Sequence, residues 1–107
     1  MSWTKVLAAS ELPTGKCQAV EVDDCPLLVC RLSDEEVRVV ENRCSHQDSP
    51  LTGGSLDGHV IECPHHGAQF DLRTGEALRM PAASPIETVP VQLTEDGWIA
   101  IDEEQLP

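Results

Sequence analysis

Turn-forming pairs and triplets recur along the whole chain, and this feature limits the fold more than any other. They lie at Pro13–Gly15, Asp23–Asp24, Ser33–Asp34, Gly53–Gly54, Asp57–Gly58, Thr74–Gly75 and Asp96–Gly97. The segments between them are short, and none has the long apolar period of 3.6 residues that marks a helix. A chain divided in this way can form many short strands, which favours an all-β sandwich or barrel.

Strand-length segments fill the spaces between these turns. Residues 89–93 alternate between apolar and other residues, and residues 98–101 form a continuous apolar run, both of which are strand patterns. With weaker segments of the same kind, we expect strands at Lys5–Ala8, Lys16–Val22, Pro26–Leu32, Val37–Glu41, His59–Glu62, Ala68–Asp71, Ile86–Leu93 and Trp98–Ile101. The Asp-Gly pairs at 57–58 and 96–97 are hairpin signals, so we expect antiparallel pairing.

The chain gives no sign of internal division. Its 107 residues and 11.6 kDa suit one compact domain over residues 1–107, and no repeat, low-complexity tract or Gly/Ser linker interrupts them. The first 16 residues lack the apolar segment of a secretory signal, and no stretch reaches the roughly 18 apolar residues of a membrane span. We therefore expect a cytoplasmic monomer without membrane contact.

The charge is strongly negative and unevenly distributed. The 19 acidic and 7 basic residues give a net charge of -12, which repels nucleic acid phosphates and anionic membrane surfaces. Residues 1–41 hold 8 acids and 4 bases, residues 42–80 hold 5 and 3, and residues 81–107 hold 6 and none. The middle segment is thus the least acidic, and we expect it to form a fairly apolar tip on an acidic body that steers a partner's approach.

Two Cys/His pairs lie in this middle segment. Cys44-x-His46 is followed, 16 residues later, by Cys63-x-x-His66. Five cysteines without a secretory signal favour metal binding over a disulfide framework. Packing residues on one strand or helix face could produce the same spacing, but turn-forming residues surround both pairs. Two loops are therefore predicted, and a hairpin at Ser55–Glu62 would fold the second back beside the first.

The arrangement of the pairs narrows the choice of metal centre. Zinc sites usually pair Cys with Cys and His with His, whereas each loop here offers one of each. The segment resembles the Rieske iron–sulfur family, in which loops of the forms Cys-x-His and Cys-x-x-His hold a [2Fe–2S] cluster. Residues 67–71 and 74–75 also resemble that family, as does 81–85, which matches its cluster-covering loop. The resemblance implies a Rieske-like antiparallel β sandwich or barrel with a two-loop cluster-binding subdomain at about residues 42–85.

The resemblance also implies a ligand set. Its metal ligands are Cys44 and Cys63, through sulfur on one iron, and His46 and His66, through a ring nitrogen on the other. His59 and His65 are then left as solvated surface residues. We expect the other cysteines to act as small buried hydrophobes in or beside strands; these are Cys17, Cys25 and Cys30.

The expected cluster has a low potential for its type. Two neutral imidazoles in place of thiolates raise Rieske potentials to roughly -150 to +300 mV. High-potential members of the family add a cysteine to each loop and a Ser and a Tyr that donate hydrogen bonds to sulfur. This chain has Ser49 and His65 at the first two positions and Ala68 and Phe70 at the others. Without hydroxyl donors to stabilise the reduced form, the low end of the range is expected.

By resemblance, the chain is a one-electron carrier similar to the ferredoxin component of bacterial aromatic-ring-hydroxylating dioxygenase systems, and not itself an enzyme. In that family an NAD(P)H-dependent flavoprotein reductase supplies the electron and a terminal oxygenase receives it. A chain of 107 residues has no room for the oxygenase domain. Two alternatives are the small Rieske-like subunit of an assimilatory nitrite reductase and a zinc-stabilised interaction module.

Overall fold

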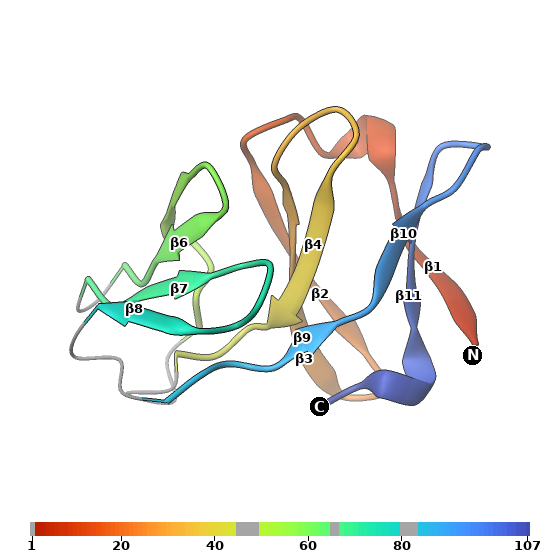
Figure 1. Cartoon of the computed structure of the whole chain (residues 1–107). Helices are drawn as coiled ribbons and strands as arrows, with labels where there is room; N and C mark the ends of the chain where they lie inside the picture. The colour runs from red at the N-terminus through yellow and green to blue at the C-terminus, as the bar shows by residue number, and fades with distance from the viewer. Residues whose placement is uncertain (1, 45–49, 65–66, 80–83) are drawn as a thin grey trace.

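The chain folds into short antiparallel strands joined by turns (Figure 1). The computed structural model describes residues 2–44, 50–64, 67–79 and 84–107. Its strands are β1 (Trp3–Ala8), β2 (Cys17–Val22), β3 (Cys25–Arg31), β4 (Val37–Glu41), β5 (Ser55–Asp57), β6 (Val60–Glu62), β7 (Gln69–Asp71), β8 (Ala77–Arg79), β9 (Thr88–Val89), β10 (Val91–Leu93) and β11 (Trp98–Asp102). Two 3₁₀ turns, η1 (Ala9–Glu11) and η2 (Glu103–Gln105), complete it. The all-β prediction is confirmed.

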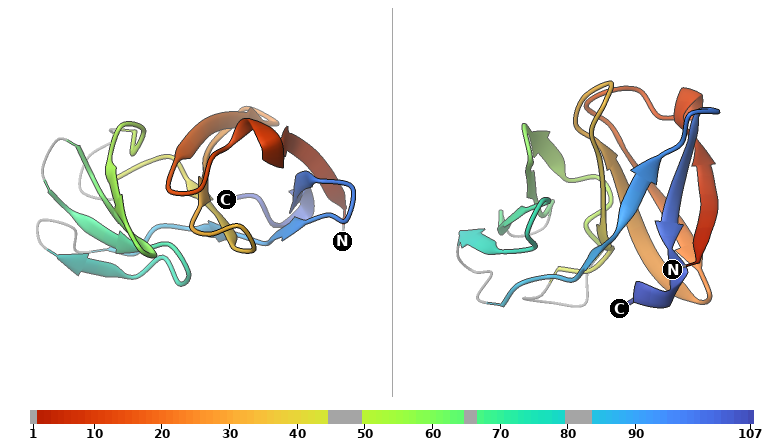
Figure 2. Two further views of the ribbon diagram at one scale, coloured as in Figure 1. Left: turned by 90° about the horizontal axis from the view of Figure 1, so that it is seen from above. Right: turned by 45° about the vertical axis from the view of Figure 1, so that its right-hand side comes forward.

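The described residues form three antiparallel sheets. The outer sheet has the order β1-β11-β10, the central sheet β2-β3-β4-β9, and the site sheet β5-β6-β7-β8. The central sheet lies between the other two, and the site sheet stands to one side of the molecule in every view (Figures 1 and 2). Strands β5 to β8 therefore form a separate layer beside the central sheet.

Strand β3 is buried on both faces, which explains why its sequence reads as a continuous apolar run. Because side chains alternate along a strand, Leu27 and Val29 face the outer sheet while Leu28 and Cys30 face the site sheet. The body core is the first of the two resulting clusters: Ala9, Leu12, Leu27, Val29, Val37, Val39, Val89, Ile99 and Ile101. The site core is the second: Leu28, Cys30, Val40, Cys44, Leu51, Ile61, Cys63, Ala68, Phe70, Leu72 and Ile86.

The strand predicted at Ile86–Leu93 is wrong as a single element, because it is divided at Pro90. Strand β9, before the proline, pairs with β4 in the central sheet, whereas β10, after it, pairs with β11 in the outer sheet. Proline has no N–H to donate to a ladder, so it suits the point at which the chain leaves one sheet for the other. The alternation of residues 89–93 concealed this crossover.

Both hairpins predicted from Asp-Gly pairs are present. Strands β5 and β6 pair antiparallel across residues 57–58, and β10 and β11 pair across 96–97. Gly97 has φ +86°, a conformation that favours glycine, and its N–H donates to Thr94 O at 3.1 Å. Strands β5 and β8 were not among the predicted strands. Within the described residues, no helix has the length and apolarity needed to span a bilayer.

Candidate metal centre

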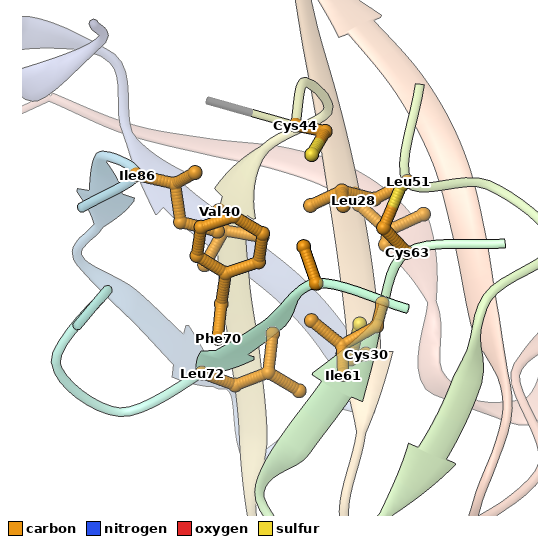
Figure 3. Packing of buried hydrophobic residues seen from close by; sticks show 11 residues of the cluster. Leu28, Cys30, Val40, Cys44, Leu51, Ile61, Cys63, Phe70, Leu72 and Ile86 are labelled. Atoms are coloured by element: carbon orange, nitrogen blue, oxygen red, sulfur yellow. The ribbon is translucent and has the colours of Figure 1, made fainter. Parts of the chain in front are cut away.

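Two loops beside the site core carry the predicted ligand cysteines. Cys44 follows β4, and Cys63 directly follows β6. Both residues belong to the site core, each is only 1% exposed, and neither forms a disulfide. Figure 3 shows the two side chains at the same end of the cluster, near Leu28 and Leu51. The fold thus gathers two thiols that are separated by 18 intervening residues of sequence.

The chemistry of these two sulfurs suits a metal centre. Thiolates are the usual protein ligands of iron–sulfur clusters, and a bound iron atom would compensate their negative charge in this apolar setting. Two unpaired, buried thiols from two loops therefore fit the sulfur half of a Rieske ligand set.

Asn42 closes the base of the first loop. Its Oδ1 accepts hydrogen bonds from Leu51 N at 2.8 Å and Thr52 N at 3.2 Å. Its Nδ2 donates to Thr52 Oγ1 at 2.7 Å, and its backbone N donates to Pro26 O at 3.0 Å. One amide side chain thus ties the start of the loop, two residues before Cys44, to its end. Asn42 was not predicted from the sequence, although an Asn among turn formers is a signal of such local hydrogen bonding.

The second loop is closed by its own backbone. Cys63 N donates to Ala68 O at 2.7 Å, and Gly67 N donates to Cys63 O at 3.1 Å. Gly67 has φ +70°, which a residue with a side chain adopts only at a cost. These bonds bring Gly67 and Ala68 back beside Cys63 and hold Cys63 where β6 ends.

Gly54 allows the two loops to approach each other. A Cβ atom at this position would lie 2.2 Å from Glu62 O and 3.0 Å from Leu51 O, both backbone atoms. Gly54 N donates to Leu51 O at 3.0 Å, and the next residue, Ser55, pairs with Glu62 in the sheet. The end of the first loop therefore packs directly against the residue before Cys63. Gly54 is a second positioning residue that was not predicted from the sequence.

The remaining predicted ligands, His46 and His66, lie outside the described residues. The same is true of Ser49, His65 and residues 81–83, which the resemblance singled out for other reasons. Among the described residues alone, no group of three or more His, Cys, Asp or Glu side chains is placed to hold a metal. The assignment of the two histidines stays a prediction.

His59 fits its predicted role as a surface residue. It precedes β6, whereas Cys63 follows that strand, so the two lie at opposite ends of it. Its side chain is 42% exposed, and Nε2 lies 3.7 Å from Asp71 Oδ2. His59 is therefore available as a control position for experiments on the ligands.

Apolar groups occupy the positions where high-potential Rieske proteins have hydroxyl donors. Ala68 and Phe70 are both fully buried in the site core. Figure 3 shows the Phe70 ring beside Val40 and Ile86. Neither side chain can donate a hydrogen bond to a cluster sulfur, which supports the argument for a low potential.

The sheets and loops described above define a class: a small antiparallel β protein that presents two thiol-bearing loops at one side of its core. Comparison with known proteins gives the family. The Rieske [2Fe-2S] domain model matches residues 2–90, so the chain belongs to the Rieske [2Fe–2S] family, and a Rieske-type [2Fe–2S] cluster is its cofactor.

Individual relatives are similar over almost their whole length. The chain is 41% identical over 108 residues to the 3-phenylpropionate/cinnamic acid dioxygenase ferredoxin subunit of Photorhabdus laumondii subsp. laumondii, covering 98% of this chain and 100% of that one. It is 44% identical over 94 residues to Ferredoxin CarAc of Metapseudomonas resinovorans, covering 87% of this chain and 82% of that one. A chain in the solved complex of reduced oxygenase and oxidized ferredoxin in carbazole 1,9a-dioxygenase is 36% identical, with a TM-score of 0.87, covering 98% and 96%.

Proposed function

We propose that this protein is a one-electron carrier whose [2Fe–2S] cluster is bound by Cys44, His46, Cys63 and His66. Residues 1–107 act as one cytoplasmic domain, with the cluster-binding segment at about 42–85. The observation that carries the proposal is the burial of Cys44 and Cys63 together, unpaired, on two loops of a Rieske-family chain. The cluster, when bound, takes up and releases a single electron.

The residues of this chain set how readily that electron is held. Cys44 and Cys63 bring the negative charge of their thiolates to the site, while the imidazoles are neutral ligands. The site core excludes water behind the thiolates, and Ala68 and Phe70 offer no hydrogen bond to the more negative reduced form. The imidazoles raise the potential above that of an all-cysteine cluster, whereas the apolar core and the missing donors lower it, so we place it at the low end of the Rieske range.

The partners follow from the relatives. Proteins at 41% and 44% identity are named as a dioxygenase ferredoxin subunit and a ferredoxin, and one solved relative is in a complex of oxygenase and ferredoxin. We propose that an NAD(P)H-dependent flavoprotein reductase donates the electron and that the terminal oxygenase of an aromatic-ring-hydroxylating system accepts it. These relatives favour this role over that of a nitrite reductase subunit. The net charge of -12 would speed association with basic partner surfaces.

The ligand set is tested by spectroscopy of single variants. Reduced protein should give the EPR signal of a Cys/His-ligated cluster, and His46→Ala or His66→Ala should abolish it together with the native visible spectrum. His59→Ala is the matched control, since that side chain is exposed and lies at the other end of β6, and it should keep both signals. A native spectrum in either ligand variant, or its loss in the control, would overturn the assignment.

The carrier role is tested by reconstitution. NAD(P)H with a flavoprotein reductase should reduce the cluster, and a terminal oxygenase should reoxidise it within the turnover time of the complete system. Raising the ionic strength should slow both transfers if charge steers the encounters. A cluster that exchanges electrons with a nitrite reductase, but with no reductase or oxygenase of the aromatic-ring systems, would reverse the choice of partners.

A further inference from the structure

A second pair of cysteines lies in the central sheet. Cys17 in β2 and Cys30 in β3 are direct cross-strand partners. Arg31 N donates to Lys16 O at 3.0 Å, so Lys16 and Arg31 occupy a hydrogen-bonded position and the neighbouring pair, Cys17 and Cys30, a non-hydrogen-bonded one. Facing Cα atoms in such positions are about 4.5 Å apart, with their side chains at closest approach. This separation falls within the range of about 4.4–6.8 Å that disulfides span.

The two sulfur atoms are in contact. Sγ of Cys17 and Sγ of Cys30 lie 2.7 Å apart, and both thiols are free. Cys30 is fully buried in the site core, whereas Cys17 is partly exposed and packs against that core. One thiol is therefore within reach of a small solute from solvent, and the other is held directly behind it.

The environment gives the two thiols different acidities. The hydrogen bond with Cys30 lowers the pKa of Cys17 below its ordinary value. The same hydrogen bond and burial raise the pKa of Cys30. The reactive thiolate is thus favoured on the partly exposed residue, as in cysteines that react with oxidants.

We propose that Cys17 and Cys30 form a second redox site, a dithiol that hydrogen peroxide oxidises to an intramolecular disulfide. The Cys17 thiolate attacks one peroxide oxygen, the O–O bond breaks, and a sulfenic acid forms with release of hydroxide, which takes up a proton to become water. The Cys30 sulfur then attacks the Cys17 sulfur; the S–S bond forms, the S–O bond breaks, and the thiol proton and hydroxide leave as water. Two thiols and one peroxide give one disulfide and two waters, so two electrons pass from sulfur to peroxide.

This site is separate from the cluster ligands. It uses two electrons and two thiols of the central sheet, and it needs no change of register, because β2 and β3 already pair through these residues. The reaction does not depend on which partners the carrier serves. Each chain can thus reduce one equivalent of peroxide with Cys30, inside the site core, and Cys17, which packs against that core.

Cys25 supplies a matched control within the same two strands. It lies opposite Val22 in the sheet, so no cysteine faces it, and its Sγ lies 3.9 Å from Pro107 O. It is a free, partly buried thiol like Cys17, but it lacks a thiol partner.

The test is peroxide treatment of the cluster-loaded protein, followed by unfolding with N-ethylmaleimide present to block free thiols. Cleavage before aspartate separates fragment 1–22, with Cys17, from fragment 24–33, with Cys25 and Cys30. Mass spectrometry should find these two fragments joined, two hydrogens lighter than their sum, and separated again by dithiothreitol. Cys25→Ser should keep the link, and Cys17→Ser should lose it.

The variants also separate the chemistry from folding. Cys30→Ala is preferred to Cys30→Ser because the position is fully buried, and it should lose the link while its visible spectrum stays native. The proposal is overturned if Cys25→Ser removes the link, or if peroxide joins only the fragments that carry Cys44 and Cys63. Oxidation of Cys17 to sulfinic acid without any link would equally overturn it.

Discussion

Arg73 and Glu36 form a two-pronged ion pair that ties the site sheet to the central sheet. Arg73, in the turn between β7 and β8, donates from Nε to Glu36 Oε2 at 2.8 Å and from Nη2 to Oε1 at 2.8 Å. Glu36 lies just before β4 and also accepts a hydrogen bond from Arg38 Nε at 3.0 Å. The site sheet is thus tied to the central sheet by two residues that lie 37 positions apart in the sequence.

Glu36→Gln should lower the free energy of unfolding by up to about 1 kcal/mol at pH 7, the upper range for exposed ion pairs. The hydrogen bond from Arg73 lowers the pKa of Glu36 from 4.5 to about 2. A carboxyl whose pKa is lower in the folded state stabilises that state fully at pH values above its unfolded-state pKa. This stabilisation is lost as the pH falls through the folded-state pKa. Urea unfolding followed by tryptophan fluorescence should show the difference between wild type and variant shrinking from pH 4.5 to pH 2. A difference that is constant over that interval would exclude the linkage.

The fold was predictable where local patterns decide it. Asp-Gly pairs located two hairpins, and the continuous apolar run of β3 matched a strand that is buried on both faces. The sheet crossover at Pro90 was not predictable, because both halves of that segment keep a strand pattern and only distant partners distinguish them. The register that sets Cys17 opposite Cys30 is likewise a property of pairing between strands.

The ligand chemistry of the site was predictable from the sequence, whereas the residues that position its two loops were not. The turn-forming residues around Cys44 and Cys63 indicated two loops, and both thiols are buried in one core. Asn42 and Gly54 act through backbone atoms elsewhere in the chain, so their roles appear only when the loops are folded. The assignment of His46 and His66 as ligands rests on the family resemblance.

Gly54→Ala should disturb the meeting of the two loops. The added methyl would lie 2.2 Å from Glu62 O, a backbone atom that can move only with β6. Overpacking of this kind typically costs about 1–3 kcal/mol, and here the shift would fall next to Cys63. We expect a lower unfolding temperature and less cluster per chain, measured by visible absorbance against total protein.

Ser55→Ala provides the comparison for Gly54→Ala. Ser55 is the next residue, it is exposed, and its substitution removes only a hydroxyl group. The variant should match wild type in both measurements. Equal cluster content in the two variants would show that the close approach of Gly54 to β6 has no part in loading.

Asn42→Ala should loosen the first loop. It leaves Leu51 N and Thr52 N without their acceptor and removes the donor to Thr52 Oγ1. At about 0.5–1.5 kcal/mol for each of the three hydrogen bonds, the loss is on the order of 1.5–4.5 kcal/mol. The rate of cluster loss to an iron chelator should rise accordingly.

Asn42→Asp separates the two functions of this side chain. It keeps an oxygen acceptor for the two backbone N–H groups and loses only the donor, so its rate of cluster loss should lie between those of wild type and Asn42→Ala. If Asn42→Asp is as unstable as Asn42→Ala, the acceptor role assigned to Oδ1 is wrong.

Phe70→Tyr should raise the midpoint potential of the cluster. Phe70 is fully buried in the site core that contains Cys44 and Cys63, and a hydroxyl there would offer the hydrogen bond that the native side chain lacks. A donor to sulfur favours the reduced, more negative form, so the shift is positive.

Ala68→Ser should act in the same direction, because Ala68 is also buried in this core. Phe70→Leu, which adds no hydroxyl, controls for the change in packing, and voltammetry of the three variants measures the midpoint. Native spectra with unchanged potentials in both hydroxyl variants would refute the explanation of the low potential, since that explanation assigns it to the missing donors.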